Sequence, residues 1–473
     1  MELEAQFQEA CRLVQRGREW KALPILTELL IDSPSDWRIY AEIGEASMRA
    51  RLFRKAEKAF KLALSLYPKH KILQISLIDC YINQRRYKLA GKLLDIVKGS
   101  FIGTSDAPRW AASYGVYLAG TERFEEAEKY FRYVLQEVPG WAKIYGCMGN
   151  LEVLRYRFKD GLRWFEKQWA LQKDWEHAQD LGFHLQLNGF WRAGFQMLLT
   201  SAKLHWTHDR LQGRRDWTGR PCDEAIVFED GGLGDLVHYG RYLAIAKQRV
   251  KRLLFVPEER HAAIVKYLNF PAELVSDVRV IPKNIPAAWQ MTLPGVLGVP
   301  DPKDSPATIL PSFVRMDIPH PAVAITWDGD PKFANKHYRQ ISLAHWRQLI
   351  LDHPEIHWFT VSPGISIKRK IERMKLPITQ YSGDFLQACR YLTSADAYVG
   401  VDTGHAHVTA TAGIPTHIVL HRWVDQRWGI DGHRTPYYNS ARLYRSYLDG
   451  GFAPSLRRIS AELSNLKIRG ETS

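Results

Sequence analysis

Residues 35–68 read SDWRIYAEIGEASMRARLFRKAEKAFKLALSLYP, and the spacing within this stretch decides the fold of the first part of the chain. Small and aromatic residues recur at intervals that place them on the facing sides of two helices. Small residues let two antiparallel helices approach closely, aromatic side chains fill the remaining gaps, and a closing proline ends the second helix. The positions concerned are Tyr40, Ile43, Gly44, Ser47, Phe53, Ala56, Phe60, Ala63 and Pro68.

The same skeleton recurs along the first two hundred residues, which is the tetratricopeptide (TPR) pattern. The clearest further copies contain Tyr114, Gly115, Phe124, Ala127, Phe131 and Pro139, and then Tyr145, Gly149, Phe158, Gly161 and Phe165. Weaker copies begin near Gly17, Tyr81 and Gly182. About six copies predict a TPR α-solenoid over residues 1–205. Such a solenoid binds a partner along its groove or serves as an architectural arm, and it supplies no chemistry itself.

The periodicity changes after a junction at residues 206–221, where glycine and proline enter the segment RLQGRRDWTGRPCD at 210–223. Short apolar runs then alternate with helical stretches, which predicts parallel β-α-β units. The expected strands are 225–229, 253–257, 278–282, 322–327, 358–361, 397–401 and 416–420. A stretch at 282–321 with nine prolines separates the two sets. We therefore expect two Rossmann-like lobes, at 222–318 and at 319–473 with a closing C-terminal helix, and ligands at the carboxyl ends of their strands.

The first motif of this second part is EDGGLGDLVHYGRYL at 229–243, in which an expected strand runs through glycines into a helix. Gly231, Gly232 and Gly234 would allow close approach of backbone to a ligand, and the helix N-terminus favours negative charge nearby. Asp235 is the sole ionisable side chain between the glycines and the helix. It is our candidate general base toward an acceptor hydroxyl, and the alternative is that it only caps the helix.

The second motif is VGVDTGHAHVTATAGIPTHIVL at 399–420, where a buried strand ends at Asp402, Thr403 and Gly404 before a helix of small residues. The free N–H groups at this helix start suit a diphosphate. His405 and His407 lie on the first turn, within reach of a phosphate, and the alternative for His407 is a purely structural role.

The third motif is AITWDGDPKFANKHYRQISLAHW at 324–346, where another expected strand leads into a polar loop. Lys336 and Arg339 in this loop would neutralise a leaving diphosphate in place of a metal ion. The alternative is an exposed basic loop without a ligand.

Together these motifs resemble those of the TPR-linked glycosyltransferases related to peptide O-linked N-acetylglucosamine transferase and, more distantly, to lipopolysaccharide heptosyltransferases. The family pattern E-Q-G-x-G-D…R-Y is matched by Glu229, Gly232, Gly234, Asp235, Arg241 and Tyr242. The W-x-G-N-P…R-S-I loop is matched by Trp327, Gly329, Pro331, Arg339 and Ile341, and V-D-T…H…G-x-P by Val401, Asp402, Thr403, His407, Gly413 and Pro415. A later W-R-W…Y-x-S-x-R-L-F-R region is echoed by Gln426-Arg427-Trp428 and by 435–445.

The resemblance implies a GT-B fold, a pair of Rossmann-like lobes that transfers a sugar with inversion and without an obligatory metal. The co-substrate would be a nucleotide-diphosphate sugar, and no further cofactor is implied. Asp235 would be the base. Trp327, Lys336, Arg339, Asp402, Thr403, Gly404, His405 and His407 would form the donor site. His405 replaces an apolar residue of the family, so its contacts would be peculiar to this chain.

The charge of the chain bears on the acceptor, which we expect to be a macromolecular hydroxyl, most simply that of a protein. The formal net charge is +14, and residues 51–100 hold twelve Lys/Arg against three Asp/Glu. Arg210, Arg214, Arg215 and Arg241 are candidate acceptor contacts. The basic excess in residues 51–100 and the run Arg210, Arg214, Arg215 and Arg220 at the junction leave open DNA with hydroxylated bases as the acceptor. A non-catalytic TPR scaffold with a vestigial sugar-nucleotide domain is the alternative from another class.

The remaining composition points to the cytoplasm. The N-terminal sequence lacks the order of a signal peptide, and no run of about eighteen apolar residues predicts a membrane span. The five cysteines are scattered and never form C-x-x-C, which argues against a disulfide framework and against a zinc site.

Overall fold

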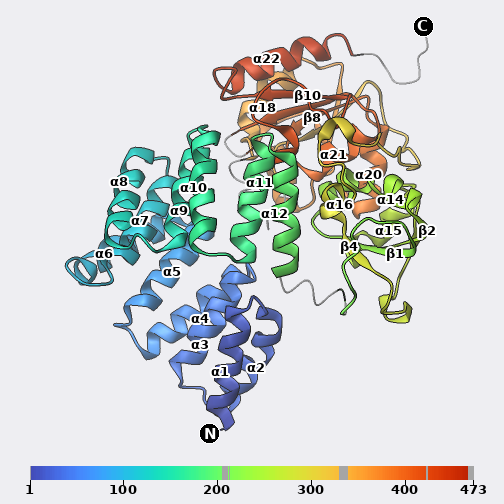
Figure 1. Cartoon of the computed structure of the whole chain (residues 1–473). Helices are drawn as coiled ribbons and strands as arrows, with labels where there is room; N and C mark the ends of the chain where they lie inside the picture. The colour runs from blue at the N-terminus through green and yellow to red at the C-terminus, as the bar shows by residue number, and fades with distance from the viewer. Residues whose placement is uncertain (1, 205–210, 212, 330–338, 422–423, 467–473) are drawn as a thin grey trace. The chain divides into compact units, whose positions relative to one another are not determined.

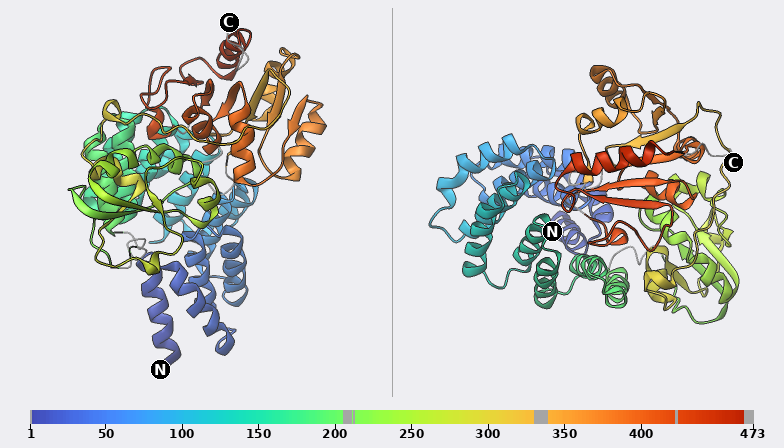
Figure 2. Two further views of the ribbon diagram at one scale, coloured as in Figure 1. Left: turned by 90° about the vertical axis from the view of Figure 1, so that its right-hand side faces the viewer. Right: turned by 90° about the horizontal axis from the view of Figure 1, so that it is seen from above.

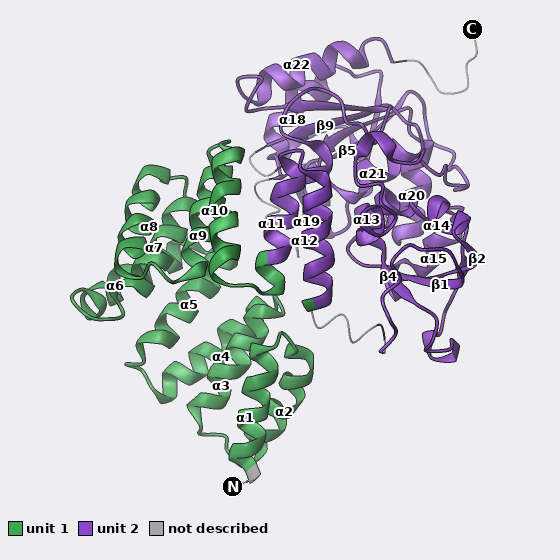
Figure 3. Cartoon of the chain, in the orientation of Figure 1, with its two compact units in different colours: residues 1–177, 204–207 green, residues 178–203, 208–473 purple. Residues whose placement is uncertain are grey.

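The computed structural model describes residues 2–204, 211, 213–329, 339–421 and 424–466. Its internal contacts divide the chain into two compact units (Figure 3). Unit 1 comprises Met1–His177 with Leu204–Thr207, and unit 2 comprises Ala178–Lys203 with His208–Ser473. The contacts thus group Ala178–Lys203, which the repeat pattern assigns to the solenoid, with the α/β part of the chain.

Unit 1 is a succession of antiparallel helical hairpins, coloured from blue to teal in Figures 1 and 2. Its helices are α1 (Glu2–Gln15), α2 (Glu19–Asp32), α3 (Trp37–Arg49), α4 (Phe53–Leu66), α5 (Lys71–Asn83), α6 (Tyr87–Phe101), α7 (Ala107–Gly120), α8 (Phe124–Glu137), α9 (Ala142–Leu154) and α10 (Phe158–Leu171). The predicted TPR-like helical-repeat solenoid is confirmed. Two further helices, α11 (Trp175–Leu187) and α12 (Trp191–Leu204), follow in the sequence and belong largely to unit 2.

The predicted pairing of small and aromatic residues holds the hairpins together. A β-carbon on Gly44 in α3 would overlap the ring of Phe60 in α4, and one on Gly115 in α7 would overlap Phe131 in α8. Both rings are 1% exposed. Each glycine therefore forms the socket for the aromatic ring of its partner helix, and large apolar side chains of this kind contribute most of the packing energy.

Unit 2 contains an N-terminal lobe (residues 222–318) built on a fully parallel four-stranded sheet in the order β3-β2-β1-β4. Its elements are β1 (Cys222–Phe228), α13 (Leu233–Gly240), α14 (Leu243–Gln248), β2 (Val250–Val256), η2 (Glu259–His261), α15 (Ala262–Val265), β3 (Glu273–Leu274), η3 (Val278–Val280), β4 (Ala287–Trp289), η4 (Gln290–Thr292), α16 (Leu293–Val296) and η5 (Pro302–Asp304). The strand predicted at 278–282 is wrong: Val278–Val280 forms a single 3-10 turn. The strand that pairs with β1 lies instead at 287–289, inside the proline-rich stretch.

The C-terminal lobe of unit 2 (residues 319–466) has a fully parallel six-stranded sheet in the order β7-β6-β5-β8-β9-β10. Its elements are β5 (Ala322–Thr326), α18 (Leu343–Leu351), β6 (His357–Thr360), α19 (Ile365–Met374), β7 (Ile378–Gln380), α20 (Phe385–Ser394), β8 (Ala397–Val401), α21 (Gly404–Thr411), β9 (Thr416–Leu420), η6 (Gln426–Trp428), β10 (Ala441–Arg445) and α22 (Phe452–Leu463). Counted within the lobe this is the order 3-2-1-4-5-6 of a doubly wound sheet. Alternating strands and helices were predicted here, although β7 and β10 were missed.

Candidate functional site

The topology of unit 2 marks one binding position in each lobe. In a doubly wound sheet, a ligand binds beyond the carboxyl ends of the strands where the strand order reverses. In the N-terminal lobe this point lies between β1 and β4, and the loop after β1 is the predicted glycine loop with Asp235. In the C-terminal lobe it lies between β5 and β8, and the residues after β8 are Asp402, Thr403 and Gly404.

The two switch points face one another, because the helices that follow them, α13 and α21, are in contact. A β-carbon on Gly234 would lie 2.8 Å from the His407 ring, and one on Gly404 would lie 3.3 Å from the amide nitrogen of Gly234. Such short distances leave little room for a side chain at either position, which is one physical reason for glycine there. The structure thus brings together two predicted motifs that lie 170 residues apart in the sequence (404 − 234).

Asp235 lies in the first turn of α13, and both of its carboxylate oxygens have a donor. Oδ2 accepts a hydrogen bond from the Gly232 amide at 2.8 Å, and Oδ1 accepts one from Nη1 of Arg427 at 2.7 Å. Gly231 adopts φ +94°, a conformation that favours glycine, and brings the loop back over the carboxylate. The side chain is 20% exposed. Asp235 therefore stabilises the start of its helix and also joins the two lobes.

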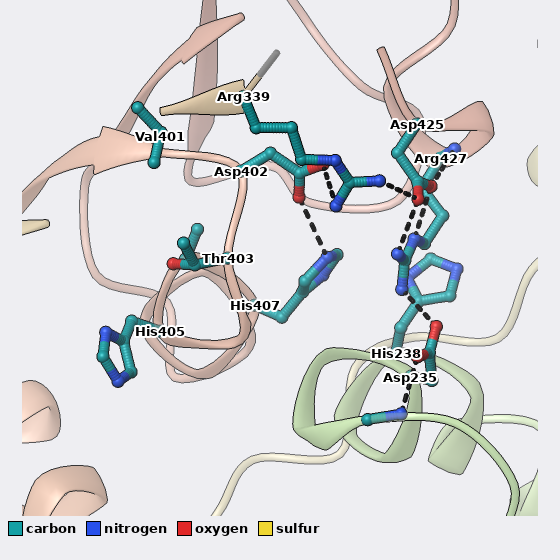
Figure 4. A network of polar contacts seen from close by, with 12 residues as sticks. Asp235, His238, Arg339, Val401, Asp402, Thr403, His405, His407, Asp425 and Arg427 are labelled. Carbon is teal, nitrogen blue, oxygen red and sulfur yellow. Dashed lines mark hydrogen bonds and ion pairs between the residues drawn. The ribbon is translucent and has the colours of Figure 1, made fainter. Parts of the chain in front are cut away.

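A line of alternating charges continues from Asp235 into the C-terminal lobe (Figure 4). Arg427 donates to both oxygens of Asp425 at 2.7 and 2.9 Å. Arg339 places Nη2 3.1 Å from Asp425 and Nη1 2.9 Å from Oδ2 of Asp402. Three carboxylates and two guanidinium groups thus link the first turn of α13 to the start of α21.

Burial and the neighbouring charges together shift the pKa values of Asp402 and Asp425 in opposite directions. Burial raises the pKa of Asp402, and the attraction of Arg339 opposes that effect only in part. For Asp425 burial also acts to raise the pKa, but Arg427 and Arg339 outweigh it and hold the pKa well below its usual range. Arg427 keeps its charge, because Asp425 and Asp235 outweigh the effect of burial and raise its pKa. The charged form is thus disfavoured at Asp402 and favoured at Asp425.

Two buried histidines, one from each lobe, share the hydroxyl of Tyr438. Nδ1 of His238 and Nδ1 of His407 each lie 2.9 Å from it. One hydroxyl carries a single proton, so it donates to one ring and accepts from the other, and the two histidines are opposite tautomers. Burial, reinforced by nearby arginines, lowers the pKa of both well below the usual value. Both rings are therefore neutral at physiological pH, and the Nε2 atoms lack a hydrogen-bond partner among the described residues.

The other predicted donor residues lie around α21 or outside the described residues. Thr403 shares a hydrogen bond with the Tyr398 hydroxyl at 3.1 Å, and His405 shares one with the Thr326 hydroxyl at 3.2 Å. Burial lowers the pKa of His405 to about 4. Trp327 is 1% exposed and packs in the core of the C-terminal lobe. Lys336 lies outside the described residues.

Two of the four arginines predicted to contact an acceptor are buried, so that role is wrong for them. Arg214 is 2% exposed and donates to the backbone oxygens of Val278 and Ile281, which hold the edge of the N-terminal lobe. Arg241 is 3% exposed and donates to the backbone oxygens of His238 and Tyr437, across the two lobes. Arg215 is exposed, and Arg210 lies outside the described residues.

Four residues of this arrangement were not predicted as site residues from the sequence: Asp425, Arg427, His238 and Tyr438. Arg427 and Tyr438 lie in regions matched in the family resemblance, which is the signal that points to them. No comparable signal marks His238, because its neighbours in the sequence are mainly apolar and it is therefore interpreted as a core residue of α13. Asp425 caps the turn that holds Arg427, by accepting its amide hydrogen at 3.1 Å.

Comparisons with known proteins match the chain to helical-repeat structures. No protein-family model matches the chain, and no curated protein matches it in sequence. MamA from Desulfovibrio magneticus RS-1 is 21% identical, covers 38% of this chain and 97% of that chain, and has a TM-score of 0.29. A tetratricopeptide repeat protein from Parabacteroides merdae is 13% identical, covers 44% and 81%, and has a TM-score of 0.37. YrrB, a TPR protein with an unusual peptide-binding site, is 20% identical, covers 36% and 87%, and has a TM-score of 0.26.

The described residues hold neither a metal-binding cluster nor a membrane-spanning helix. No group of three or more His, Cys, Asp or Glu side chains is arranged there to hold a metal ion. Within the same residues, no helix combines the length and the apolar character needed to cross a bilayer.

Proposed function

We propose that unit 2 is an inverting glycosyltransferase of GT-B architecture, which transfers a sugar from a nucleotide-diphosphate donor to a hydroxyl group of a macromolecule. The observation that carries the proposal is the meeting of two strand-order switch points, one from each parallel sheet, at Gly234 and Gly404. Two doubly wound lobes whose binding edges face each other can hold a donor on one side and an acceptor on the other.

The donor belongs on the C-terminal side, at the start of α21. The amide groups of the first turn and the helix dipole favour an anion there, and the Thr403 hydroxyl adds a donor. Arg339 lies beside this helix start and supplies positive charge toward a departing diphosphate. Lys336, in the same loop of the sequence, is proposed as a second cation.

The reaction would be a single displacement. The acceptor oxygen forms a bond to the anomeric carbon while the bond from that carbon to the diphosphate oxygen breaks, and the diphosphate leaves with the electron pair. The acceptor proton passes to the carboxylate of Asp235. For this step Asp235 must exchange its contact with Arg427 for one with the acceptor, so we expect the pair to separate when the substrates are bound.

The acceptor is proposed to be a protein. The DNA alternative rested on the basic excess in residues 51–100 and on arginines at the junction, and it loses support because Arg214 binds backbone oxygens inside unit 2. The scaffold alternative predicts no donor binding at all, so the same experiment separates it from the enzyme.

A thermal-shift panel with UDP-, GDP-, ADP- and dTDP-sugars tests the donor site in the full chain. One nucleotide class should raise the melting temperature of the wild type, and the Thr403→Ala variant should lose that shift. A Thr218→Ala variant removes an exposed hydroxyl before β1 and should keep it. Absence of any shift, or an equal shift in all three proteins, would contradict a donor site at α21.

A further inference from the structure

The excess of basic residues in 51–100 lies mainly on one side of unit 1. The first helices of successive hairpins contact one another, as α3 contacts α5 and α5 contacts α7, whereas no comparable contacts join the second helices α4, α6 and α8. A stack of hairpins curves toward the side where neighbours are closest, so the second helices form its outer side. The basic residues of α4 and α6 therefore face away from the groove.

Basic and aliphatic side chains alternate on the exposed sides of α4 and α6. We call this set the outer basic-apolar face: Arg54, Lys55, Lys58, Leu62 and Leu66 on α4, and Lys88, Leu89, Lys92 and Ile96 on α6. The spacings of three and four residues place each group on one side of its helix. The aliphatic members are 48%, 44%, 38% and 68% exposed for Leu62, Leu66, Leu89 and Ile96.

The positive charges of this face are not compensated. No ion pair among the described residues involves Arg54, Lys55, Lys58, Lys88 or Lys92. The acid of α4, Glu57, is largely buried and already paired with Lys61 and Arg86 at 2.6 Å each. Asp95 is the other acid of these two helices. The face thus combines free positive charge with exposed aliphatic surface.

The next outer helix has a different surface, so the face is a local feature rather than a property of the repeat. On α8 the exposed residues include Glu125, Glu126, Lys129 and Arg132, and Arg132 is paired with Glu128 at 2.6 Å. Exposed aliphatic residues are therefore interleaved with unpaired lysines on α4 and α6, whereas α8, all of which is described, carries mixed charges and no exposed aliphatic side chain.

We propose that the outer basic-apolar face docks on an anionic membrane surface. Lysines close to an anionic leaflet gain electrostatic energy from it, and aliphatic side chains among them enter the headgroup boundary. Nucleic-acid contact would explain the charge but leave four exposed aliphatic residues without a function, and the face lacks the aromatic side chains that stack on bases. Pairing with a second copy of the same face would bring like charges together. This proposal stands independently of the transferase function of unit 2.

Vesicle co-sedimentation of the full chain tests the proposal, with vesicles of phosphatidylcholine alone or with about a third phosphatidylglycerol. The wild type should bind the anionic vesicles and not the neutral ones. A charge variant, Lys55→Glu with Lys58→Glu, Lys88→Glu and Lys92→Glu, should lose at least about tenfold in binding. An apolar variant, Leu62→Ser with Leu66→Ser, Leu89→Ser and Ile96→Ser, keeps the net charge and should still lose severalfold.

The matched control carries the same four charge reversals on other outer helices: Lys129→Glu, Arg132→Glu, Lys159→Glu and Lys167→Glu. It should bind anionic vesicles within about twofold of the wild type. Equal losses in the control and the charge variant would reduce the effect to net charge and overturn the proposal. So would unchanged binding by the apolar variant. Tighter binding to a short DNA duplex than to vesicles, insensitive to the apolar variant, would assign the face to nucleic acid.

Discussion

Gly44 in unit 1 and Gly234 in unit 2 both lie against an aromatic ring that a β-carbon would overlap, but the two rings have different surroundings. The ring beside Gly44 is Phe60, which lies in an apolar core. The ring beside Gly234 is His407, which shares the Tyr438 hydroxyl and stacks on Trp428 at 4.8 Å. The same close approach therefore serves packing alone in the repeats, and in unit 2 it brings polar groups of two lobes together.

The two regions also differ in how they hold charge. In the repeats, many ion pairs, such as Arg132 with Glu128, lie near the surface, with the arginine side chain 61% exposed, although Arg155 and Glu152 form a buried pair. In unit 2 the paired side chains of Arg427 and Asp425 are buried, at 8% and 9% exposed. Charge pairs are worth little at a surface and cost much when one partner of a buried pair is removed. This difference predicts where substitutions have large effects.

The largest effect should follow Arg427→Met, which leaves Asp425 and Asp235 without their shared partner. We expect a loss of about 3–5 kcal/mol in the free energy of unfolding, measured by urea denaturation. The matched Arg132→Met variant in unit 1 removes an exposed pair and should cost about 0–1 kcal/mol. A cost for Arg427→Met no greater than for Arg132→Met would mean that the network is hydrated.

Acid should destabilise unit 2 more than unit 1. Burial lowers the pKa of His184 to about 3 and of His417 to about 4, and it also lowers those of His238 and His407. All four lie in unit 2. Because the folded pKa lies below the unfolded value, only the unfolded chain takes up these protons, and stability falls as the pH drops below about 6.5. Each histidine contributes up to about 1.4 kcal/mol per pH unit.

Hydrogen exchange measured peptide by peptide at about pH 7 and about pH 5.5, corrected for intrinsic rates, checks this prediction. Protection should fall in unit 2, and a His407→Gln variant should show a smaller fall. Equal loss of protection in both units would argue that the buried histidines do not control the response.

The two glycines allow a direct comparison of packing with function. Gly44→Ala should cost about 1–3 kcal/mol through overlap with Phe60 and leave nucleotide binding unchanged. Gly234→Ala should cost a similar amount and also weaken the thermal shift produced by the nucleotide sugar. Unfolding curves and the thermal-shift panel measure the two effects separately. A Gly234→Ala variant with full nucleotide response would contradict a site assembled from both lobes.

A more local effect should follow Tyr438→Phe, which removes the hydroxyl shared by His238 and His407. Two buried ring nitrogens lose their partner, so we expect a loss of about 2 kcal/mol in the free energy of unfolding. Tyr444→Phe is the matched control, because among the described residues that hydroxyl bonds to the ring of His417 alone, at 3.0 Å. It should cost about half as much, and equal costs would count against the shared hydrogen bond.

The fold could be predicted from the sequence where a local pattern repeats. The sockets at Gly44, Gly115 and Gly149 recur with the same spacing, and each hairpin needs only its neighbours. Most strands of unit 2 were found because buried parallel strands are short apolar runs. Strands β3 and β4 were not, because they have two and three residues and lie near prolines, and β7 and β10 were also missed.

The loops of the candidate site could be predicted from the sequence, but the side-chain contacts between the two lobes could not. Asp235 and Thr403 follow strands and precede helices, which is a local signal. That Arg427 would bind Asp235, or that His238 and His407 would share one hydroxyl, depends on how two lobes meet, and no local spacing specifies that. The role of Arg214 and Arg241 was predicted wrongly for the same reason. Both guanidinium groups donate to backbone oxygens inside unit 2, and the local sequence does not show those partners.

Turnover of a nucleotide sugar in water tests the central claim most directly, because water can replace an unknown acceptor. Proton NMR of the full chain with the nucleotide sugar that stabilises it should show slow release of the free sugar with inverted anomeric configuration. Asp235→Asn should reduce the rate by at least about a hundredfold, whereas Asp230→Asn, in the same loop, keeps its hydrogen bond from the Met291 amide and should retain most of it. Retained configuration, or equal rates in Asp235→Asn and wild type, would contradict the proposed transferase mechanism.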